Sequence, residues 1–484
     1  MLVSIKEKYE TVVGLEVHVQ LNTVSKAYCS DSNLFGEPPN TCISPISAGY
    51  PGTLPKINKE VINSAIKLGL ALNCNITEYN LYARKNYFYP DLPKGYQITQ
   101  DTTPICTGGY VEIANSKEKS FKIALTRIHM EEDAGKSIHD LDPFHSLIDL
   151  NRAGVPLLEI VSEPEISSTE QAYQYLYEIR KLVRYLGISN GNMEEGSLRC
   201  DANISVRLKG SKELRNRVEV KNINSFKNVM KAIDLEAKRQ INCYENNEDV
   251  NQETRNYNAH NNTTTVLRSK EDAHDYRYFT EPDIPPVIID ETFINDIKKD
   301  MPILPKERFH TYTKIYKLSD YDANLLIDDK SLSDLFDTIT EHTSSYKTVV
   351  NIIMGVIKSY LNEKSLSIND IKIPPKHIAE LAEMLDKNQI NHIIVSQKLF
   401  PEMMINNTSP KIIAKEKNWI QEDDTKTIEM QIIKVLEKYP QKVIEYQNGN
   451  TNLIGLFMGE IMRETKGKIN PKLINETLKK KLKK

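Results

Sequence analysis

Residues Ile128 to Lys136 read Ile-His-Met-Glu-Glu-Asp-Ala-Gly-Lys, so three consecutive carboxylates follow closely after a histidine. Adjacent carboxylates repel one another, and an ordered arrangement of them normally requires a bound cation, a cluster of Lys or Arg side chains, or exposure to solvent. Taken alone, these residues fit solvent exposure as well as a binding site. The choice between the two depends on the rest of the chain.

Three further segments, 14–20, 198–207 and 218–221, alternate apolar and polar residues with the period of two that is typical of a β-strand. Each segment would present its polar side chains on one face of a sheet. These side chains are Glu16, His18 and Gln20 in the first segment, Arg199, Asp201, Asn203, Ser205 and Arg207 in the second, and Glu219 and Lys221 in the third. The solvated face of a sheet would give any one strand the same pattern. Because several such faces carry acidic, basic and imidazole groups, we favour a polar cleft.

Length and composition are those of an ordinary globular protein of two or three domains, with 484 residues of which 39% are hydrophobic and 27% charged. The first residues contain neither an apolar signal core nor an Arg-rich transit pattern, and no apolar run approaches the length that spans a membrane. The six cysteines show no disulfide-framework spacing and suit a reducing compartment. We therefore expect a cytoplasmic protein with no membrane segment.

The residue pattern changes along the chain. Up to about Asp290 it mixes strands and helices, and from about Phe293 the apolar spacing is mostly helical, with a further break near 406–410. These changes predict an α+β fold in three domains: a mixed domain over 1–292, an all-helical domain over 293–408 and a small helical tail domain over 409–484.

Local signals define three features of the mixed region. Asn58 is expected to cap a helix that stops near Asn73, and Ser168 with Gln171 forms a capping-box pattern before a second helix. The segment 246–265 is Asn-rich and polar, which suggests an excursion such as a long hairpin tip.

The formal net charge of −3 conceals an asymmetry between the two ends of the chain. From Lys411 to the end, 16 Lys and Arg residues face 10 Asp and Glu residues, whereas the preceding residues carry a net charge of −9. A basic tail behind an acidic body is typical of a protein that holds nucleic acid. A solvated last helix would explain the charge equally well.

Seven collinear motifs carry a resemblance to a known family. They are Tyr9–Leu21 (YETVVGLEVHVQL), Arg84–Gln97 (RKNYFYPDLPKGYQ), His129–Lys136, Asp149–Arg152 (DLNR), Glu159–Pro164 (EIVSEP), Met193–Asn203 (MEEGSLRCDAN) and Asp275–Phe279 (DYRYF). Together they resemble the B subunit of the tRNA-dependent amidotransferases. The likeness runs from about residue 9 to the C-terminal helices.

The resemblance implies one member of a heterotrimer that converts Glu-tRNA(Gln) to Gln-tRNA(Gln), and in many bacteria also Asp-tRNA(Asn) to Asn-tRNA(Asn). It implies that this chain uses ATP and Mg2+ to phosphorylate the side-chain carboxylate, and that ammonia from its glutaminase (A) partner displaces the phosphate, while a small C partner wraps the pair. It also implies that the mixed domain is a catalytic cradle of antiparallel sheet and helices related to glutamine synthetase, and that the tail domain contacts tRNA.

The resemblance also assigns site residues by motif. Metal ligands would be Glu16, His18, Glu132 and Glu219. Alternation alone leaves open which of Glu131 and Glu132 points inward, and the resemblance selects Glu132. The catalytic candidates are Glu132, Glu131, Lys85 and Arg199, and those that would hold the nucleotide or support the cleft are Arg152, Lys221, Asp201, Asn203 and Arg277. Structural ion pairs with the same acidic residues are the competing interpretation of the basic side chains.

One motif departs from the family. Many relatives carry a zinc knuckle, Cys-x-Cys followed by Cys-Pro-x-Cys, where this chain has Cys29-Ser-Asp31 and Ser44-Pro-Ile-Ser47. We expect no zinc here, with the loop held by ordinary packing.

Two alternative functions stay open from the sequence. The chain could be a non-catalytic scaffold that binds tRNA, or a stand-alone ATP-dependent ligase acting on a small acid. No serine arrangement suited to glutamine hydrolysis is evident, so we expect ammonia to come from a partner.

Overall fold

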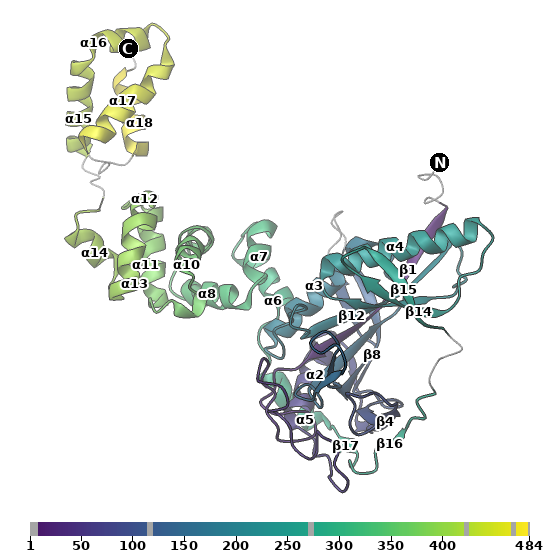
Figure 1. Cartoon of the computed structure of the whole chain (residues 1–484). Helices are drawn as coiled ribbons and strands as arrows, with labels where there is room; N and C mark the ends of the chain where they lie inside the picture. The colour runs from purple at the N-terminus through teal and green to yellow at the C-terminus, as the bar shows by residue number, and fades with distance from the viewer. Residues whose placement is uncertain (1–7, 114–119, 270–274, 421–424, 466–470, 483–484) are drawn as a thin grey trace. The chain divides into compact units, whose positions relative to one another are not determined.

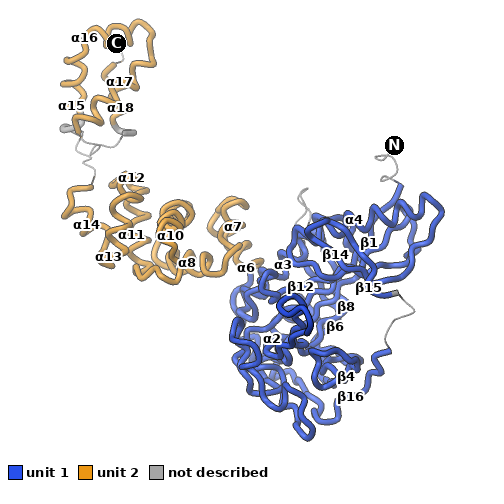
Figure 2. The backbone as a smooth tube through the Cα atoms, in the orientation of Figure 1, with its two compact units in different colours: residues 1–304 blue, residues 305–484 orange. Residues whose placement is uncertain are grey.

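The computed structural model describes residues 8–113, 120–269, 275–420, 425–465 and 471–482. The chain divides into two compact units, residues 1–304 and residues 305–484 (Figure 2). Each unit contains its own buried apolar residues.

The first unit is organised around a sheet with β1 (Tyr9–Gln20) near its centre. The strand order is β15-β14-β13-β12-β1-β11-β8-β6-β2, with β7 paired to the first half of β8, and every pair is antiparallel except β13 with β14. The bounds are β2 Asn75–Ile76, β6 Cys106–Thr107, β7 Tyr110–Ile113, β8 Phe121–Glu132, β11 Pro156–Ser162, β12 Leu198–Leu208, β13 Val218–Ile223, β14 Glu253–Asn258 and β15 Thr263–Ser269.

The two faces of this sheet differ because the strands alternate. In β1 the side chains of Val13, Leu15, Val17 and Val19 are fully buried. Helices α2 (Lys59–Ala71), α3 (Thr169–Tyr185) and α4 (Phe226–Glu245) pack against the apolar side of the sheet (Figure 1). The opposite face is left for the polar residues.

The predicted helix caps are confirmed. Asn58 accepts the Glu60 amide at the start of α2, and Ser168 accepts the Gln171 amide at the start of α3. The second hydrogen bond of the capping box differs from the usual one. The Gln171 side chain accepts a hydrogen bond from the amide of Ser167 and not from that of Ser168.

The Asn-rich segment contains a hairpin, as predicted. Strands β14 and β15 pair antiparallel with Asn258 opposite Thr263, and this hairpin forms one edge of the main sheet.

Short strands flank the main sheet in the first unit. They form a three-stranded sheet of β16 (Phe279–Thr280), β4 (Ala83–Asn86) and β5 (Tyr96–Thr99), a pair of β3 (Tyr79–Asn80) and β17 (Val287–Ile288), and a pair of β9 (Lys136–Ile138) and β10 (Leu147–Asp149). Helix α5 (Glu291–Lys299) also belongs to this unit, because Ile297 is buried in its core. The first unit therefore extends to Leu304, beyond the position where the apolar spacing becomes helical.

The second unit is helical, as the spacing from Phe293 onward predicts. Two separate apolar clusters lie within it, one formed by residues between Tyr312 and Ala414 and one by residues between Ile432 and Leu482. The helices are α6 Pro305–His310, α7 Asp320–Ile327, α8 Lys330–Thr340, α9 Tyr346–Asn351, α10 Lys358–Lys364, α11 Pro375–Asp386, α12 His392–Ile394, α13 Phe400–Asn406, α14 Pro410–Glu416, α15 Thr425–Lys438, α16 Pro440–Gln447, α17 Ile454–Glu464 and α18 Pro471–Leu482, with π-helical turns at 311–315, 352–357 and 395–399.

The α+β class predicted from the sequence is confirmed by this mixture of sheet and helices. Within the described residues, no helix combines the length and apolar character needed to cross a membrane. The division into three domains stays a prediction.

Candidate functional site

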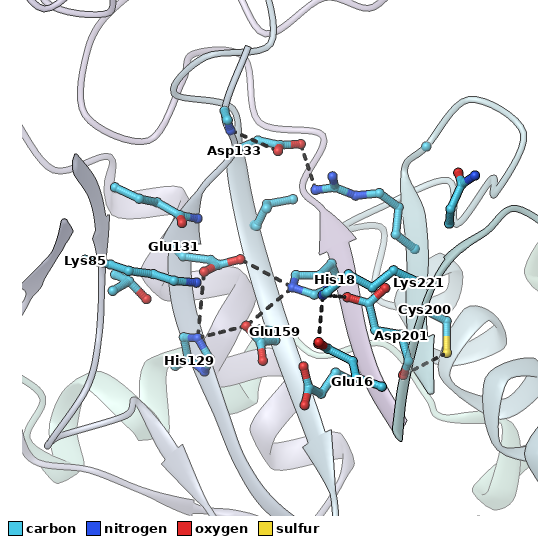
Figure 3. A pocket seen from close by; sticks show the side chains of 18 of the residues that line it. Glu16, His18, Lys85, His129, Glu131, Asp133, Glu159, Cys200, Asp201 and Lys221 are labelled. Atoms are coloured by element: carbon cyan, nitrogen blue, oxygen red, sulfur yellow. Dashed lines mark hydrogen bonds and ion pairs between the residues drawn. The ribbon is translucent and has the colours of Figure 1, made fainter. Parts of the chain in front are cut away.

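A cavity of about 830 Å3 lies over the polar face of the main sheet. Side chains from β8, β11, β1, β12 and β13 form its floor, and Figure 3 shows the central ones pointing toward one another. Lys85 and Tyr87, from β4 and the turn that follows it, contribute to the wall.

Cross-strand register brings the polar residues together. His18 on β1 lies opposite Glu159 on β11 and Arg199 on β12, and Glu16 lies opposite Asp201. Glu159 in turn lies opposite His129 on β8. Directly opposed side chains in an antiparallel pair are about 4.5–5.5 Å apart at Cβ, which is close enough for these groups to interact.

A first cluster consists of His18, Glu131 and Glu159, whose potential ligand atoms all lie within 4.8 Å of one another. The Nε2 atom of His18 is 3.4 Å from Glu159 and 3.6 Å from Glu131. His129 adds a second imidazole, with its Nε2 atom 3.2 Å from Glu159. The Nδ1 atom of His129 is buried and has no hydrogen-bond partner among the described residues.

The charges in this cluster shift its protonation equilibria. Burial and the neighbouring charge of Glu159 raise the pKa of Glu131. Burial alone would raise the pKa of Glu159, but His129 and His18 hold it well below its usual range. Burial would lower the pKa of His18, but its hydrogen bond to Glu159 and the charges of Glu159 and Glu131 raise it to about 9. The imidazole of His18 is therefore protonated at neutral pH, and a cation that bound to it would displace that proton.

A second cluster consists of Glu16, Asp201 and Glu219, again with ligand atoms within 4.8 Å of one another. Lys221 donates to Asp201 at 2.6 Å and to Glu219 at 2.8 Å, so it holds two of the three carboxylates. Glu16 accepts a hydrogen bond from Asn203 at 2.8 Å. Burial and the charges of Glu159 and Glu219 raise the pKa of Glu16, so the third carboxylate is the least compensated.

Two predicted arginines meet at one carboxylate, Asp133. Arg199 donates to Asp133 at 2.8 Å, and the Arg152 guanidinium lies 3.7 Å from the same carboxylate while donating to the carbonyls of Ala134 and Gly135. Arg199, Arg152 and Lys221 therefore line the cavity and form structural ion pairs at the same time.

Lys85 differs from these cations. Its ammonium lies 5.0 Å from the centre of the Tyr276 ring. Burial would lower the pKa of Lys85, but the charge of Glu131 raises it, so it stays protonated.

The choice of Glu132 as the inward-facing carboxylate does not fit the structure. Glu131 lines the cavity, whereas Glu132 lies on the other face of β8 and is 3% exposed. Its carboxylate accepts the amide of Ile98 at 2.8 Å and pairs with Lys94. Ile128 and Met130 are fully buried, so alternation along β8 places Glu132 on their side and Glu131 on the side of His129.

Two further predicted residues lie outside the cavity wall. Asn203 supports the second cluster through Glu16 and lines a neighbouring cavity of about 290 Å3. Arg277 is exposed, has a positive φ of 45°, and does not line the cavity, although its neighbours Tyr276 and Tyr278 do.

The sequence patterns did not single out Glu159, His129 or Asp133 as individual site residues. Glu159 is the one charged residue in the strand Pro156–Ser162, between the fully buried Leu158 and Ile160. A lone carboxylate in an apolar strand is a signal that could have identified it, because buried charges are normally paired or bound to a metal.

The loop with the altered knuckle is held by hydrogen bonds. Asp31 accepts the amide of Ser44 at 2.9 Å and the hydroxyl of Ser47 at 2.5 Å, so three of the four knuckle positions meet. Burial raises the pKa of Cys29 to about 11, which disfavours the thiolate that zinc requires. The absence of zinc stays a prediction.

Comparison with known proteins gives matches along most of the chain. Residues 11–295 match the GatB/GatE catalytic domain, and residues 334–482 match the GatB domain. A protein of Thermodesulfovibrio yellowstonii is 48% identical over 476 residues, which cover 98% of this chain and 100% of the relative. Relatives from Brachyspira hyodysenteriae and Crocosphaera subtropica are 47% and 46% identical, covering 98% of this chain and 99% and 98% of their own lengths. All three are named as the B subunit of aspartyl/glutamyl-tRNA(Asn/Gln) amidotransferase.

Proposed function

Because the chain belongs to the family of B subunits of the aspartyl/glutamyl-tRNA amidotransferases, ligases that use glutamine as amide donor, we propose that its cavity performs the activation and amidation steps. In this proposal ATP phosphorylates the side-chain carboxylate of Glu-tRNA(Gln), and Asp-tRNA(Asn) is the proposed second substrate. Ammonia then attacks the acyl phosphate and releases inorganic phosphate. Activation is necessary because a free carboxylate would have to expel an oxide.

The observation that carries the proposal is the pair of acidic clusters in one cavity. Glu16 and His18 are two residues apart on β1, so both clusters lie on the same face of the sheet. Phosphoryl transfer needs negative charge on the phosphate to be neutralised from more than one side. Lys85, Lys221 and Arg268 supply cationic groups around the same cavity.

The residues of both clusters fit Mg2+. Five carboxylates provide the hard oxygen donors that Mg2+ prefers. Burial and neighbouring carboxylates raise the pKa values of Glu131 and Glu16, and a bound cation would oppose that effect. Glu131, Glu159 and His18 would hold one ion, and Glu16, Asp201 and Glu219 a second. Bound there, the ions would neutralise phosphate oxygens and orient the triphosphate. Glu131 replaces Glu132 in this assignment because only Glu131 faces the cavity.

The basic residues have separate roles in the proposal. Lys85 lies close enough to Glu131 for their charges to interact and, as a half-buried cation in the cavity wall, can orient the substrate carboxylate toward the phosphate. Lys221 fixes Asp201 and Glu219, so it positions ligands for the second ion. Arg199 with Asp133 fixes the end of the cavity near Arg152.

The names of the relatives describe one subunit of a larger enzyme, which supports a multi-subunit assembly. We propose that the partners are a glutaminase, the A component, which supplies ammonia, and a small C component. The tail domain is proposed to bind tRNA, since Lys479, Lys480 and Lys481 are exposed on α18 while Ile474 and Leu478 are buried beneath them. The relation of the first unit to glutamine synthetase and the three-domain division with boundaries at 292 and 408 belong to the same proposal.

The test is amide formation on Glu-tRNA(Gln) by this chain together with its partner subunits, supplied with ATP, Mg2+ and ammonium in place of glutamine. Ammonium separates the chemistry of this cavity from the glutaminase. Product that requires ATP supports the proposal. Bound tRNA without product would instead favour the non-catalytic scaffold, and equal activity toward free glutamate would favour the stand-alone ligase.

A further inference from the structure

A further cavity of about 460 Å3, here called the side groove, opens beside the main one. Met193, Glu194 and Asn224 line both cavities, so the two adjoin. The remaining wall of the side groove includes Arg180 and Arg184 from the last turns of α3 and Phe226 from the first turn of α4. The acid–metal chemistry proposed above uses none of these three residues.

The side groove has a basic and aromatic lining. Glu194 is the one acidic residue among the described residues that line it, and it is exposed at the junction with the main cavity. The Arg180 guanidinium lies 5.9 Å from the centre of the Phe226 ring. The Nε atom of Arg180 is buried and has no hydrogen-bond partner in the described part of the chain. A buried guanidinium donor without a partner indicates an acceptor that the protein itself does not supply.

The wall of the side groove is held in a fixed shape. A Cβ atom on Gly191 would lie 2.9 Å from Cγ of Arg180, and Gly191 has a φ of +62°, so only glycine allows the loop to pack on this arginine. The same loop closes on itself, since the Asn190 side chain accepts the Asn192 amide and the Asn192 side chain accepts the Glu194 amide, both at 3.0 Å. The edge of the Tyr173 ring supports Phe226 at a centroid distance of 5.7 Å.

The start of α4 adds to the positive potential. Ser225 caps this 20-residue helix, and its first turn contains no acidic residue. The amino end of a helix carries partial positive charge and favours an anion. The groove therefore combines two guanidinium groups, a helix terminus and an aromatic ring, which is the combination that holds single-stranded nucleic acid through phosphate contacts and base stacking.

We propose that the side groove binds the single-stranded 3′ end of the aminoacyl-tRNA, with Arg180 and Arg184 contacting its phosphates and Phe226 contacting a base. This inference rests on the proposed function, in which the esterified amino acid reacts in the main cavity. The amino acid is attached to the terminal nucleotide, so the adjoining phosphates must enter beside the acidic clusters. An anionic backbone would be repelled by those carboxylates, and the side groove offers it a basic path that ends at the cavity.

The experiment compares two RNAs on the full chain assembled with its partner subunits. One is intact tRNA(Gln), and the other is the same tRNA without its three 3′-terminal nucleotides. We expect removal of these nucleotides to weaken binding by about tenfold for the wild type, the effect of losing charge-assisted hydrogen bonds. Arg184→Ala should weaken binding of intact tRNA by a similar factor. In this variant, removal of the three terminal nucleotides should then cause little further loss of affinity. It should also reduce the slope of log affinity against log salt by about 0.7.

Arg184 is exposed, so its replacement is not expected to disturb the fold, and Arg180→Ala provides a second variant with the same expected result. The matched control is Lys238→Ala, which removes an exposed cation from α4 outside the groove and should keep the wild-type loss on trimming. If removal of the three terminal nucleotides lowers the affinity of the two arginine variants as much as that of the wild type, the proposal is wrong. The binding comparison needs no catalysis. If the complex lacks amidation activity but the arginine variants still lose their sensitivity to removal of the 3′ end, the proposed chemistry is wrong and the proposed role of the side groove stands.

Discussion

The two adjacent glutamates of β8 should give opposite results when each is replaced by glutamine. Glu131 faces the cavity beside His18 and Glu159, whereas Glu132 is buried against Lys94 and the amide of Ile98. Glu131→Gln should abolish about 99% or more of amidation, because even residues that only support metal ligands contribute about 10–100-fold. The stability of this variant should be unchanged or higher in the absence of metal, because a neutral side chain removes both the cost of burying the charge and the repulsion from Glu159.

Glu132→Gln should destabilise the first unit. Lys94 is 15% exposed and would lose its charged partner, while the amide oxygen of the glutamine can still accept from Ile98. A hydrogen bond to a charged group contributes about 1.5–3 kcal/mol, and we expect a loss in that range. The assays are urea unfolding of each variant and amidation with ammonium at saturating ATP. Loss of activity without loss of stability in Glu132→Gln, together with a fully active Glu131→Gln, would refute the assignment.

Three other predictions follow from particular contacts. Asp322 pairs with Lys347 at 2.6 Å. Burial alone would raise the pKa of Asp322, but Lys347 and Ser319 lower it in the folded protein. The ion pair therefore stabilises the fold at pH values above the unfolded-state pKa of Asp322, and this stabilisation is lost as the pH falls through the folded-state pKa. Asp322→Asn should thus lower the urea midpoint at pH 7, and the difference from wild type should shrink in acid. Asp31→Ala should cost about 1–3 kcal/mol of stability, measured by thermal unfolding, because it removes the charged acceptor that the Ser44 amide and the Ser47 hydroxyl share. Changing Lys479, Lys480 and Lys481 together to Gln should weaken tRNA binding and flatten its salt dependence, without changing helicity by circular dichroism.

Alternation in the sequence was sufficient to assign faces within a strand. It placed Glu16 with His18, Arg199 with Asp201, and Glu219 with Lys221, and in each case both residues line the cavity. The same reasoning applied to Ile128 and Met130 would have placed Glu131 on the polar face. The resemblance instead selected Glu132, although burial of Ile128 and Met130 determines which residues of β8 face the apolar side of the sheet.

Pairing between strands could not be obtained from local patterns. The site depends on His18 lying opposite both Glu159 and Arg199, residues that are more than 140 positions away in the chain. The helix caps at Asn58 and Ser168 depend on contacts within a few residues, so the sequence predicted them correctly. The contact of Glu132 with Lys94 and Ile98 depends on β5 packing against β8, which no periodicity in either strand reveals.

The distribution of basic groups indicates where a cation would contribute most. Asp133 is already held by Arg199 and Gln20, and Lys221 pairs with both Asp201 and Glu219. In the part of the chain that the structure describes, no Lys or Arg lies within ion-pair distance of Glu131 or Glu16, whose pKa values are both raised.

Each acidic cluster therefore contains one carboxylate without a Lys or Arg partner, and the nearest opposite group to Glu131 is the imidazole of His18, at 3.6 Å. A cavity that bound only anions would place its cations there. The lack of a Lys or Arg partner at these two positions favours Mg2+ as a source of further positive charge, and with it the phosphoryl-transfer chemistry proposed for the cavity.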